Sequence, residues 1–223
     1  MWNNETSVQL HAVNIHQKWS VCDLRQSNDN KDRLLKGFVR VADKVAVYVN
    51  DKTTYGGYYE PAYMELLNYG EPATASMVVL YDLPELPIKK IFKQLRKDKV
   101  ENIILLYNNS DKHAIEKRLQ LSNPQREQMA VAYKNVMESL TKGSIDKQTL
   151  LEQYIDSVSE NALLVMEELG FVILQDGAIT KGIIKKSNLE DSSLYRSLQQ
   201  QRQQLMSCYL DNLRLSQHEL LRI

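Results

Sequence analysis

The chain has 223 residues, of which 43% are hydrophobic and 25% are charged, a composition typical of a soluble globular protein and not of a chain disordered throughout. Its 28 basic and 28 acidic residues give a formal net charge of zero, which excludes a whole-chain field that would attract nucleic acid or an anionic membrane. Two cysteines, Cys22 and Cys208, are too few for a disulfide framework, and no apolar run approaches the roughly 18 residues that a membrane span needs. We therefore expect a cytoplasmic protein.

Four short apolar segments rich in β-branched residues occur in the first half of the chain. They cover residues 21–24, 45–49, 77–81 and 103–107. Such runs are typical of strands covered on both faces, so they predict a parallel, Rossmann-like sheet. Helices are predicted over residues 31–41 and 87–98, the second from apolar residues at helical spacing. A further short helix is predicted over residues 61–68.

A polar stretch between residues 108 and 123 predicts a domain boundary. A helix is expected to begin at Pro124, which suits a first helical position, and to end near Gly143. Asp146 is then expected to cap a second helix. The sequence therefore changes here from alternating strands and helices to consecutive helices.

A third helix and a hairpin follow. Ser157 and Glu160 have the spacing of a capping box, and Asp176-Gly177 is a strong signal for a two-residue hairpin turn. Three helices followed by a hairpin predict a winged helix.

The remaining residues predict one long helix, whose apolar heptads are not sustained enough to favour a coiled coil. The predicted organisation is an α/β domain over residues 1–121, a winged-helix module over 122–187, and a C-terminal helix over 188–223 that packs back on the domains.

Six short strings occur along the chain in a fixed order. They are CDLR at 22–25, YDLP at 81–84, NIILLY at 102–107, NPQRE at 123–127, ELGFV at 168–172 and SSLY at 192–195. Their order and spacing resemble the C-terminal domain of RecJ-type single-strand-specific DNA exonucleases of low-GC Gram-positive bacteria.

The resemblance implies a parent enzyme that degrades single-stranded DNA from the 5′ end, with Mn²⁺ or Mg²⁺, in recombination and repair. The Asp-His-His triplet that names the catalytic core of that family does not occur in this sequence. The resemblance therefore implies a non-catalytic accessory domain without a cofactor of its own. Its expected partners are the RecJ catalytic core, a repair protein and, weakly, single-stranded DNA.

The helix predicted over residues 87–98 concentrates positive charge on the side opposite its apolar stripe. The basic residues are Lys89, Lys90, Lys93, Arg96 and Lys97. Such a stripe can follow a DNA backbone, and it is also typical of the solvated face of a helix that covers a sheet. We take these five residues as candidate nucleic-acid-binding residues, with the solvated face as the alternative.

The predicted third helix of the winged helix is acidic. It carries Glu160, Glu167 and Glu168, and residues 122–182 contain five basic and nine acidic residues, a net charge of −4. Because such a face repels phosphates, we expect these glutamates to bind a protein partner and not duplex DNA.

Three carboxylates follow predicted strands: Asp23, Asp51 and Asp82. Carboxylates at that edge of a parallel sheet can hold a divalent cation, but aspartates in such loops also routinely accept backbone hydrogen bonds. No second motif supports a metal site, so none is expected. Two alternatives to an accessory domain stay open: a free-standing winged-helix regulator, and a metal-dependent enzyme that uses these three residues.

Overall fold

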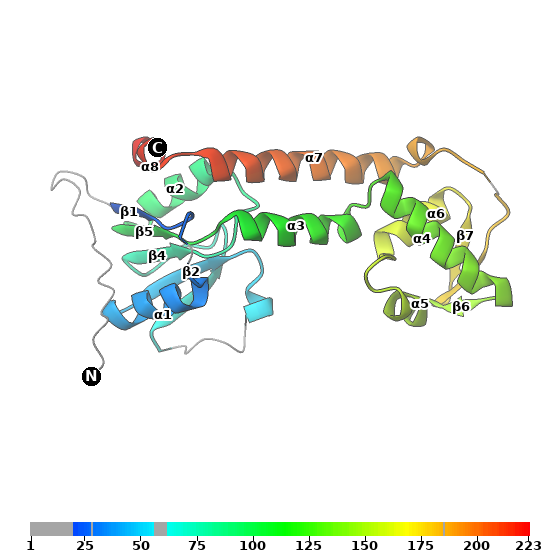
Figure 1. Cartoon of the computed structure of the whole chain (residues 1–223), viewed down its shortest axis with the longest axis horizontal. Coiled ribbons are helices and arrows are strands. Elements are labelled where there is room, and N and C mark those ends of the chain that lie inside the picture. The colour runs from blue at the N-terminus through cyan, green and yellow to red at the C-terminus, as the bar shows by residue number, and fades with distance from the viewer. Residues whose placement is uncertain (1–19, 28, 56–61, 185) are drawn as a thin grey trace. The chain divides into compact units, whose positions relative to one another are not determined.

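The computed structural model describes residues 20–27, 29–55, 62–184 and 186–223 (Figure 1). Its internal contacts divide the chain into two compact units. The first unit comprises the residues as far as Asp111 together with Cys208–Ile223, and the second comprises Lys112–Ser207. The second unit is therefore inserted into the sequence of the first.

The first unit is built on a five-stranded sheet in which every pair of neighbouring strands is parallel. The strands are β1 (Ser20–Asp23), β2 (Val45–Val49), β3 (Met64–Asn68), β4 (Met77–Leu80) and β5 (Asn102–Leu105), in the order β1-β5-β4-β2-β3. Every residue of β2 is buried. The predicted parallel sheet is confirmed.

Two helices cover the two faces of this sheet (Figure 1). α1 (Lys31–Val41) begins at Asn30, whose side chain accepts hydrogen bonds from two backbone N–H groups, and a 3-10 turn η1 (Lys52–Tyr55) follows β2. α2 (Ile88–Lys97) buries the predicted apolar stripe, Ile88, Ile91, Phe92 and Leu95. The stripe turns the charged side of α2 away from the sheet.

The predicted short helix over residues 61–68 is wrong. Met64–Asn68 form β3, which pairs in parallel with β2, while residue 61 lies outside the described part of the chain. Met64 and Leu67 are buried and three residues apart, a spacing that resembles a helix. Pairing with the buried strand β2 outweighs this weak local pattern.

The second unit consists of helices and a small antiparallel sheet. Its elements are α3 (Asn109–Ser122), which starts in the first unit, α4 (Arg126–Ser139), η2 (Leu140–Lys142), β6 (Ile145–Asp146), α5 (Lys147–Gln153), α6 (Glu160–Glu168), β7 (Val172–Gln175), β8 (Ala178–Lys181), η3 (Leu189–Asp191) and most of α7 (Ser193–Arg214). The sheet has the order β6-β8-β7. The polar stretch over residues 108–123 thus forms a helix, α3.

The local signals of the second unit are confirmed with two corrections. The helix expected to begin at Pro124 is α4, which begins two residues later, at Arg126, with Gln125 as its N-cap. Asp146 caps α5 by accepting from the Thr149 N–H at 2.8 Å. Asp176 and Gly177 have φ angles of 51° and 79°, as a tight two-residue hairpin turn requires. The cap of α6 is Ser159 and not Ser157, so the helix begins two residues later than the predicted capping box.

The predicted single helix over residues 188–223 is two helices, α7 and α8 (Gln217–Arg222). Ser216 and Glu219 form a reciprocal capping box that begins a new helix after α7. None of the helices in the described ranges is long and apolar enough to cross a membrane.

Candidate functional site

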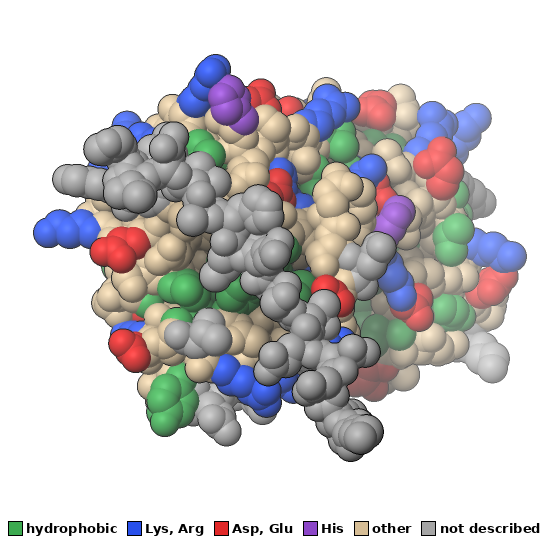
Figure 2. All heavy atoms as spheres, turned by 60° about the vertical axis from the view of Figure 1, so that its left-hand side comes forward, with side chains coloured by type: hydrophobic (Ala, Val, Ile, Leu, Met, Phe, Trp, Pro, Cys, Tyr) green, Lys and Arg blue, Asp and Glu red, His purple; other side chains and the backbone are tan. Residues whose placement is uncertain are grey.

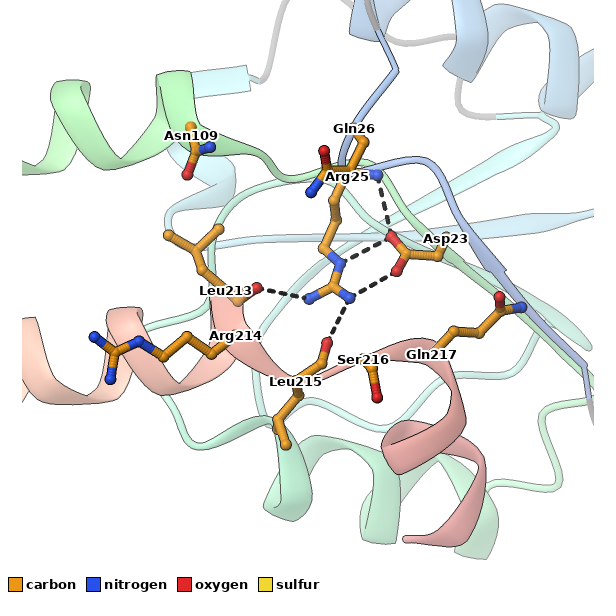
Figure 3. A pocket seen from close by; sticks show the side chains of 9 residues that line it. All are labelled: Asp23, Arg25, Gln26, Asn109, Leu213, Arg214, Leu215, Ser216 and Gln217. Carbon is orange, nitrogen blue, oxygen red and sulfur yellow. Dashed lines mark hydrogen bonds and ion pairs between the residues drawn. The ribbon is translucent and has the colours of Figure 1, made fainter.

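A polar pocket of about 350 Å³ lies in the first unit at the carboxyl end of β1 (Figure 3). Its lining comes from the loop after β1, the start of α3 and the chain from the end of α7 into α8: Asp23, Arg25, Gln26, Asn109, Leu213, Arg214, Leu215, Ser216 and Gln217. The carboxyl edge of a parallel sheet is where open α/β folds bind their ligands.

Arg25 is the centre of this pocket, and all of its hydrogen-bonding capacity is used inside the protein (Figure 3). Its Nε and Nη2 donate to the two oxygens of Asp23 at 2.8 and 2.6 Å. Nη1 donates to the carbonyls of Asn212 and Leu213, and Nη2 donates to that of Leu215 at 2.6 Å. These bonds occupy the five N–H donors of a guanidinium. Arg25 therefore caps the carboxyl end of α7 and has no donor left for a ligand.

A buried tyrosine supports the same arrangement. The guanidinium of Arg25 lies 5.6 Å from the ring centre of Tyr107. Burial raises the pKa of Tyr107 to about 12, so its hydroxyl stays protonated and donates to the Asn212 carbonyl at 3.3 Å. Arg25, which follows β1, and Tyr107, which follows β5, therefore both donate to the Asn212 carbonyl near the end of α7 within the first unit.

The three carboxylates considered for a metal site do not converge. Asp23 is bound by Arg25, Asp51 accepts from the Thr53 N–H and hydroxyl, and Asp82 accepts from the Asn50 N–H and the Tyr55 hydroxyl. In the sheet β5 separates the strand of Asp23 from that of Asp82. Among the residues that the structure describes, no group of three His, Cys, Asp or Glu side chains could hold a metal ion.

A second polar cluster at the same sheet edge has no signal in the sequence. The Lys31 ammonium lies 2.7 Å from a carboxylate oxygen of Asp111 and 4.3 Å from the ring centre of Tyr81, whose hydroxyl donates to Asp32. Burial raises the pKa of Asp111, and the nearby ammonium opposes this. Because Lys31 and Asp111 are eighty positions apart, only the fold brings them together.

The structure brings the five predicted basic residues onto one exposed side of α2. Lys89, Lys90, Lys93, Arg96 and Lys97 are all exposed. The four lysines have no ion-pair partner within 4.0 Å among the described residues. The face drawn in Figure 2 carries basic and acidic side chains interspersed. Because the whole chain has no net charge, any attraction of phosphates must come from a local basic patch such as this side of α2.

The predicted glutamates of α6 each have a partner inside the second unit. Glu160 forms an ion pair with Lys147 at 2.7 Å, and Glu167 accepts from the Leu174 N–H at 3.2 Å. Glu160 is exposed and Glu167 is half-buried.

Glu168 caps the amino end of α7. It accepts from the Ser193 and Leu194 N–H groups at 2.8 and 3.1 Å and from the hydroxyls of Ser192 and Ser193. These hydrogen bonds, the one from Ser192 first, lower the pKa of Glu168 to about 2. This capping role was not predicted from the sequence. The signal that could have indicated it is the pair Ser192-Ser193 at the start of α7, whose own first turn contains no acidic residue to accept from its N–H groups.

Comparison with protein families gives a match over residues 21–214 to the model described as single-strand DNA-specific exonuclease, C-terminal domain. The chain belongs to this family. The matched range runs from β1 to the end of α7, so the matched C-terminal domain includes elements of both units, Arg25 itself and the basic side of α2. No curated protein matches the chain, and no solved structure matches it. The family resemblance expected from the six strings is confirmed.

Proposed function

We propose that this chain is a non-catalytic accessory domain of a RecJ-type single-strand-specific DNA exonuclease, which docks on the catalytic core and contacts single-stranded DNA weakly during recombination and repair. The observation that carries the proposal is the exonuclease-domain match over residues 21–214 together with an exposed stripe of lysines on α2 that forms no ion pairs with described residues. The parent enzyme supplies the metal-dependent chemistry.

The α2 stripe suits weak, sequence-independent binding. Lys89, Lys93 and Lys97 are four residues apart, so they follow one side of a helix at intervals of about 6 Å. Ammonium groups bind phosphates as point charges and read no base edges. Because each contact releases counterions from the strand, affinity should fall steeply as salt rises.

The test is fluorescence anisotropy of a labelled oligothymidylate titrated with the full chain at several salt concentrations. The variant carries Lys89→Glu, Lys93→Glu and Lys97→Glu. A matched control reverses three exposed cations on α1, with Arg33→Glu, Lys36→Glu and Arg40→Glu. We expect the α2 variant to lose binding by about tenfold or more and the salt slope to fall by roughly 2, or about 0.7 for each lost contact. Equal losses in both variants would mean that α2 is only a solvated face.

The domain is proposed to lack nuclease activity of its own, because the Asp-His-His triplet of the family's catalytic core does not occur in the sequence. Labelled single-stranded DNA incubated with the purified chain and Mn²⁺ should stay intact. Cleavage that disappears in Asp82→Ala, but not in a mock preparation, would contradict this part of the proposal and favour the metal-dependent enzyme.

We interpret the second unit as a winged helix that docks protein. The order α4, β6, α5, α6, β7, β8 supports this interpretation, with α6 as the third helix. Its exposed Glu160 offers a carboxylate to a basic partner surface, where charge tunes association rate and specificity more than affinity. Glu167 and Glu168 add negative charge beside it while they hold β7 and α7.

Charge reversal at Glu160 tests this docking without removing a helix cap. Glu160→Lys should slow association with the separately expressed catalytic core, measured by surface plasmon resonance. Glu138→Lys, an exposed glutamate on α4, is the control. Specific binding of a duplex by the native chain at physiological salt would favour the regulator instead.

A further inference from the structure

A groove of about 700 Å³ lies within the second unit, where α4, α6 and the chain that leads into η3 meet. Its floor is apolar and consists of Met129 of α4, Met166 of α6 and Phe171, all of them buried. The ring of the half-buried Tyr133 packs edge-on against Phe171 with the ring centres 5.2 Å apart, and Leu189 of η3 is also half-buried. Thioether and aromatic groups adapt to apolar side chains of different shapes. This floor therefore suits an inserted apolar side chain.

The charged side chains that line the groove are both basic. Arg126 and Lys186 are exposed, and neither side chain has an ion-pair or hydrogen-bond partner among the described residues. The described residues of the lining include no Asp or Glu, although residues 122–182 carry a net charge of −4. The exposed Glu127 and Glu190 adjoin lining residues in the sequence but do not line the groove. The groove therefore combines positive charge with an apolar floor.

Exposed apolar side chains continue beside the groove. Ile183 and Ile184 are 88% and 41% exposed, and Lys186 follows them in the chain. Ile184 donates its backbone N–H to the carbonyl of Gly170, the residue before Phe171 of the floor. Apolar side chains that stay open to water beside a concave surface are typical of sites that bind another protein. A peptide can cover them together with the groove, whereas a small ligand fills the groove alone.

We propose that this groove binds a peptide segment of a partner protein in which acidic residues flank a large apolar side chain. The apolar side chain occupies the floor, and the carboxylates accept from Arg126 and Lys186. A volume of about 700 Å³ lies within the range of small-ligand sites, so the groove accepts a few side chains and not a folded domain. Single-stranded DNA fits less well, because it carries a negative charge at every nucleotide and Glu127 and Glu190 flank the site.

The experiment begins with selection of a random-peptide phage library on the immobilised full chain. We expect the enriched sequences to place Asp or Glu within a few positions of a leucine, a methionine or an aromatic residue. The most enriched peptide is then synthesised with a fluorescent label and blocked termini, and its affinity for the full chain is measured by anisotropy. Selection that enriches no such sequences would overturn the proposal.

The first variant tests the charges of the groove. Arg126→Glu combined with Lys186→Glu should weaken binding of the selected peptide by about tenfold or more. The control is Lys117→Glu combined with Lys134→Glu, which reverses two exposed lysines of the same unit that do not line the groove. The control should bind the peptide like the native chain. Equal losses in both variants would show that the attraction is not local to the groove and would overturn the proposal.

The second variant tests the apolar part of the groove without changing any charge. Ala130→Trp introduces a bulky side chain into the groove from an exposed position on α4, so it should weaken the peptide by about tenfold or more. Val131→Trp is the matched control, because Val131 is 50% exposed and does not line the groove. Native affinity in Ala130→Trp would place the peptide elsewhere and overturn the proposal. A thermal melt of each variant verifies that it is folded.

Oligothymidylate tests whether the groove binds nucleic acid instead. It should leave the labelled peptide bound to the native chain, and its displacement of the peptide would assign the groove to single-stranded DNA and overturn the proposal. The charge-reversal variant of Lys89, Lys93 and Lys97 should bind the peptide like the native chain, since α2 does not line the groove. Failure of the proposed DNA contact on α2 would therefore leave the peptide site intact, and the two proposals can fail separately.

Discussion

The buried side chain of Asn212, near the end of α7, holds the amino end of α2 at Ile88. Its Oδ1 accepts from the Ile88 N–H at 2.9 Å, and its Nδ2 donates to the carbonyls of Pro84 and Leu86 at 3.0 and 2.9 Å. Pro87, which precedes the helix, has no side chain that could cap it. A carboxamide from a distant part of the chain therefore performs the capping inside the first unit.

Asn212→Ala is expected to destabilise the first unit by about 2–4 kcal/mol, because it leaves the buried Ile88 N–H and the buried Pro84 carbonyl without partners and removes a third bond, to the partly buried Leu86 carbonyl. Asn212 is 1% exposed, so water cannot replace the lost bonds without a rearrangement. Urea unfolding measures the change. Asn109→Ala, at an exposed asparagine of the same unit, should shift the transition by less than about 0.5 kcal/mol. Equal shifts would show that the Asn212 contacts contribute nothing specific.

Arg25→Lys is expected to cost about 2 kcal/mol although it keeps the charge, because an ammonium has three donors and cannot reproduce a five-bond pattern. The side chain of Arg25 is 8% exposed, so solvent screens its pair with Asp23 only partly. The control is Arg33→Lys on the exposed side of α1. If both variants melt at the same temperature, Arg25 acts through charge alone and the carbonyl bonds are dispensable.

The second unit should lose stability in acid because of Glu168. Its pKa is about 2 in the folded chain, and an unperturbed glutamate has a pKa near 4.3. A carboxylate with a lowered folded pKa contributes stability above its unfolded pKa and loses it as the pH falls through the folded one. Stability should therefore decline from about pH 4.5 to about pH 2.

Glu168→Gln should flatten this part of the pH profile, which thermal melts at a series of pH values would measure. Glu160→Gln removes an exposed carboxylate that pairs with the half-buried Lys147, and it serves as the comparison. Profiles of the same shape for the native chain and Glu168→Gln would contradict the capping role.

Replacing two glycines with alanine should change the stability of the chain in opposite directions. A Cβ on Gly182 would lie 2.1 Å from the carbonyl oxygen of Gly170 and 2.7 Å from the carbonyl carbon of Phe171, so backbone would have to move. A Cβ on Gly37 in α1 would meet nothing within 4 Å. We expect Gly182→Ala to lower the melting temperature, and Gly37→Ala to add about 0.5–1 kcal/mol as alanine replaces glycine inside a helix. Tolerance of both changes would show that the chain after β8 can shift.

The sequence predicted the elements whose signals are local. Strands β2, β4 and β5 appear as continuous apolar runs because they are covered on both faces, and the hairpin turn appears because Asp176-Gly177 suits positive φ. β3 was mistaken for a helix because an edge strand pairs on one side and carries a weaker pattern. The start of α6 was missed by two residues, since several serines in a row can cap.

The candidate sites were less predictable, for a physical reason. The α2 stripe depends on residues within one helix, so its exposed side could be inferred from the apolar positions alone. The contacts of Arg25 with the carbonyls of α7 join residues more than 180 positions apart, and Asn212 meets Ile88 across 124 positions. Patterns over neighbouring residues in the sequence cannot predict contacts between residues so far apart. The pocket they shape could therefore be found only in three dimensions.

Because the second unit is inserted into the sequence of the first, the second unit is completed before the first during synthesis. A ribosome adds about 5–20 residues per second from the amino end, and a domain can fold once all of its residues have emerged. Lys112–Ser207 are all made before Cys208–Ile223, which supply Asn212 and the carbonyls that Arg25 needs. The second unit can therefore finish folding while α2 still lacks its cap. During that interval the nascent first unit exposes apolar surface that α7 and α8 later cover, and this is the stage at which a chaperone would meet the chain.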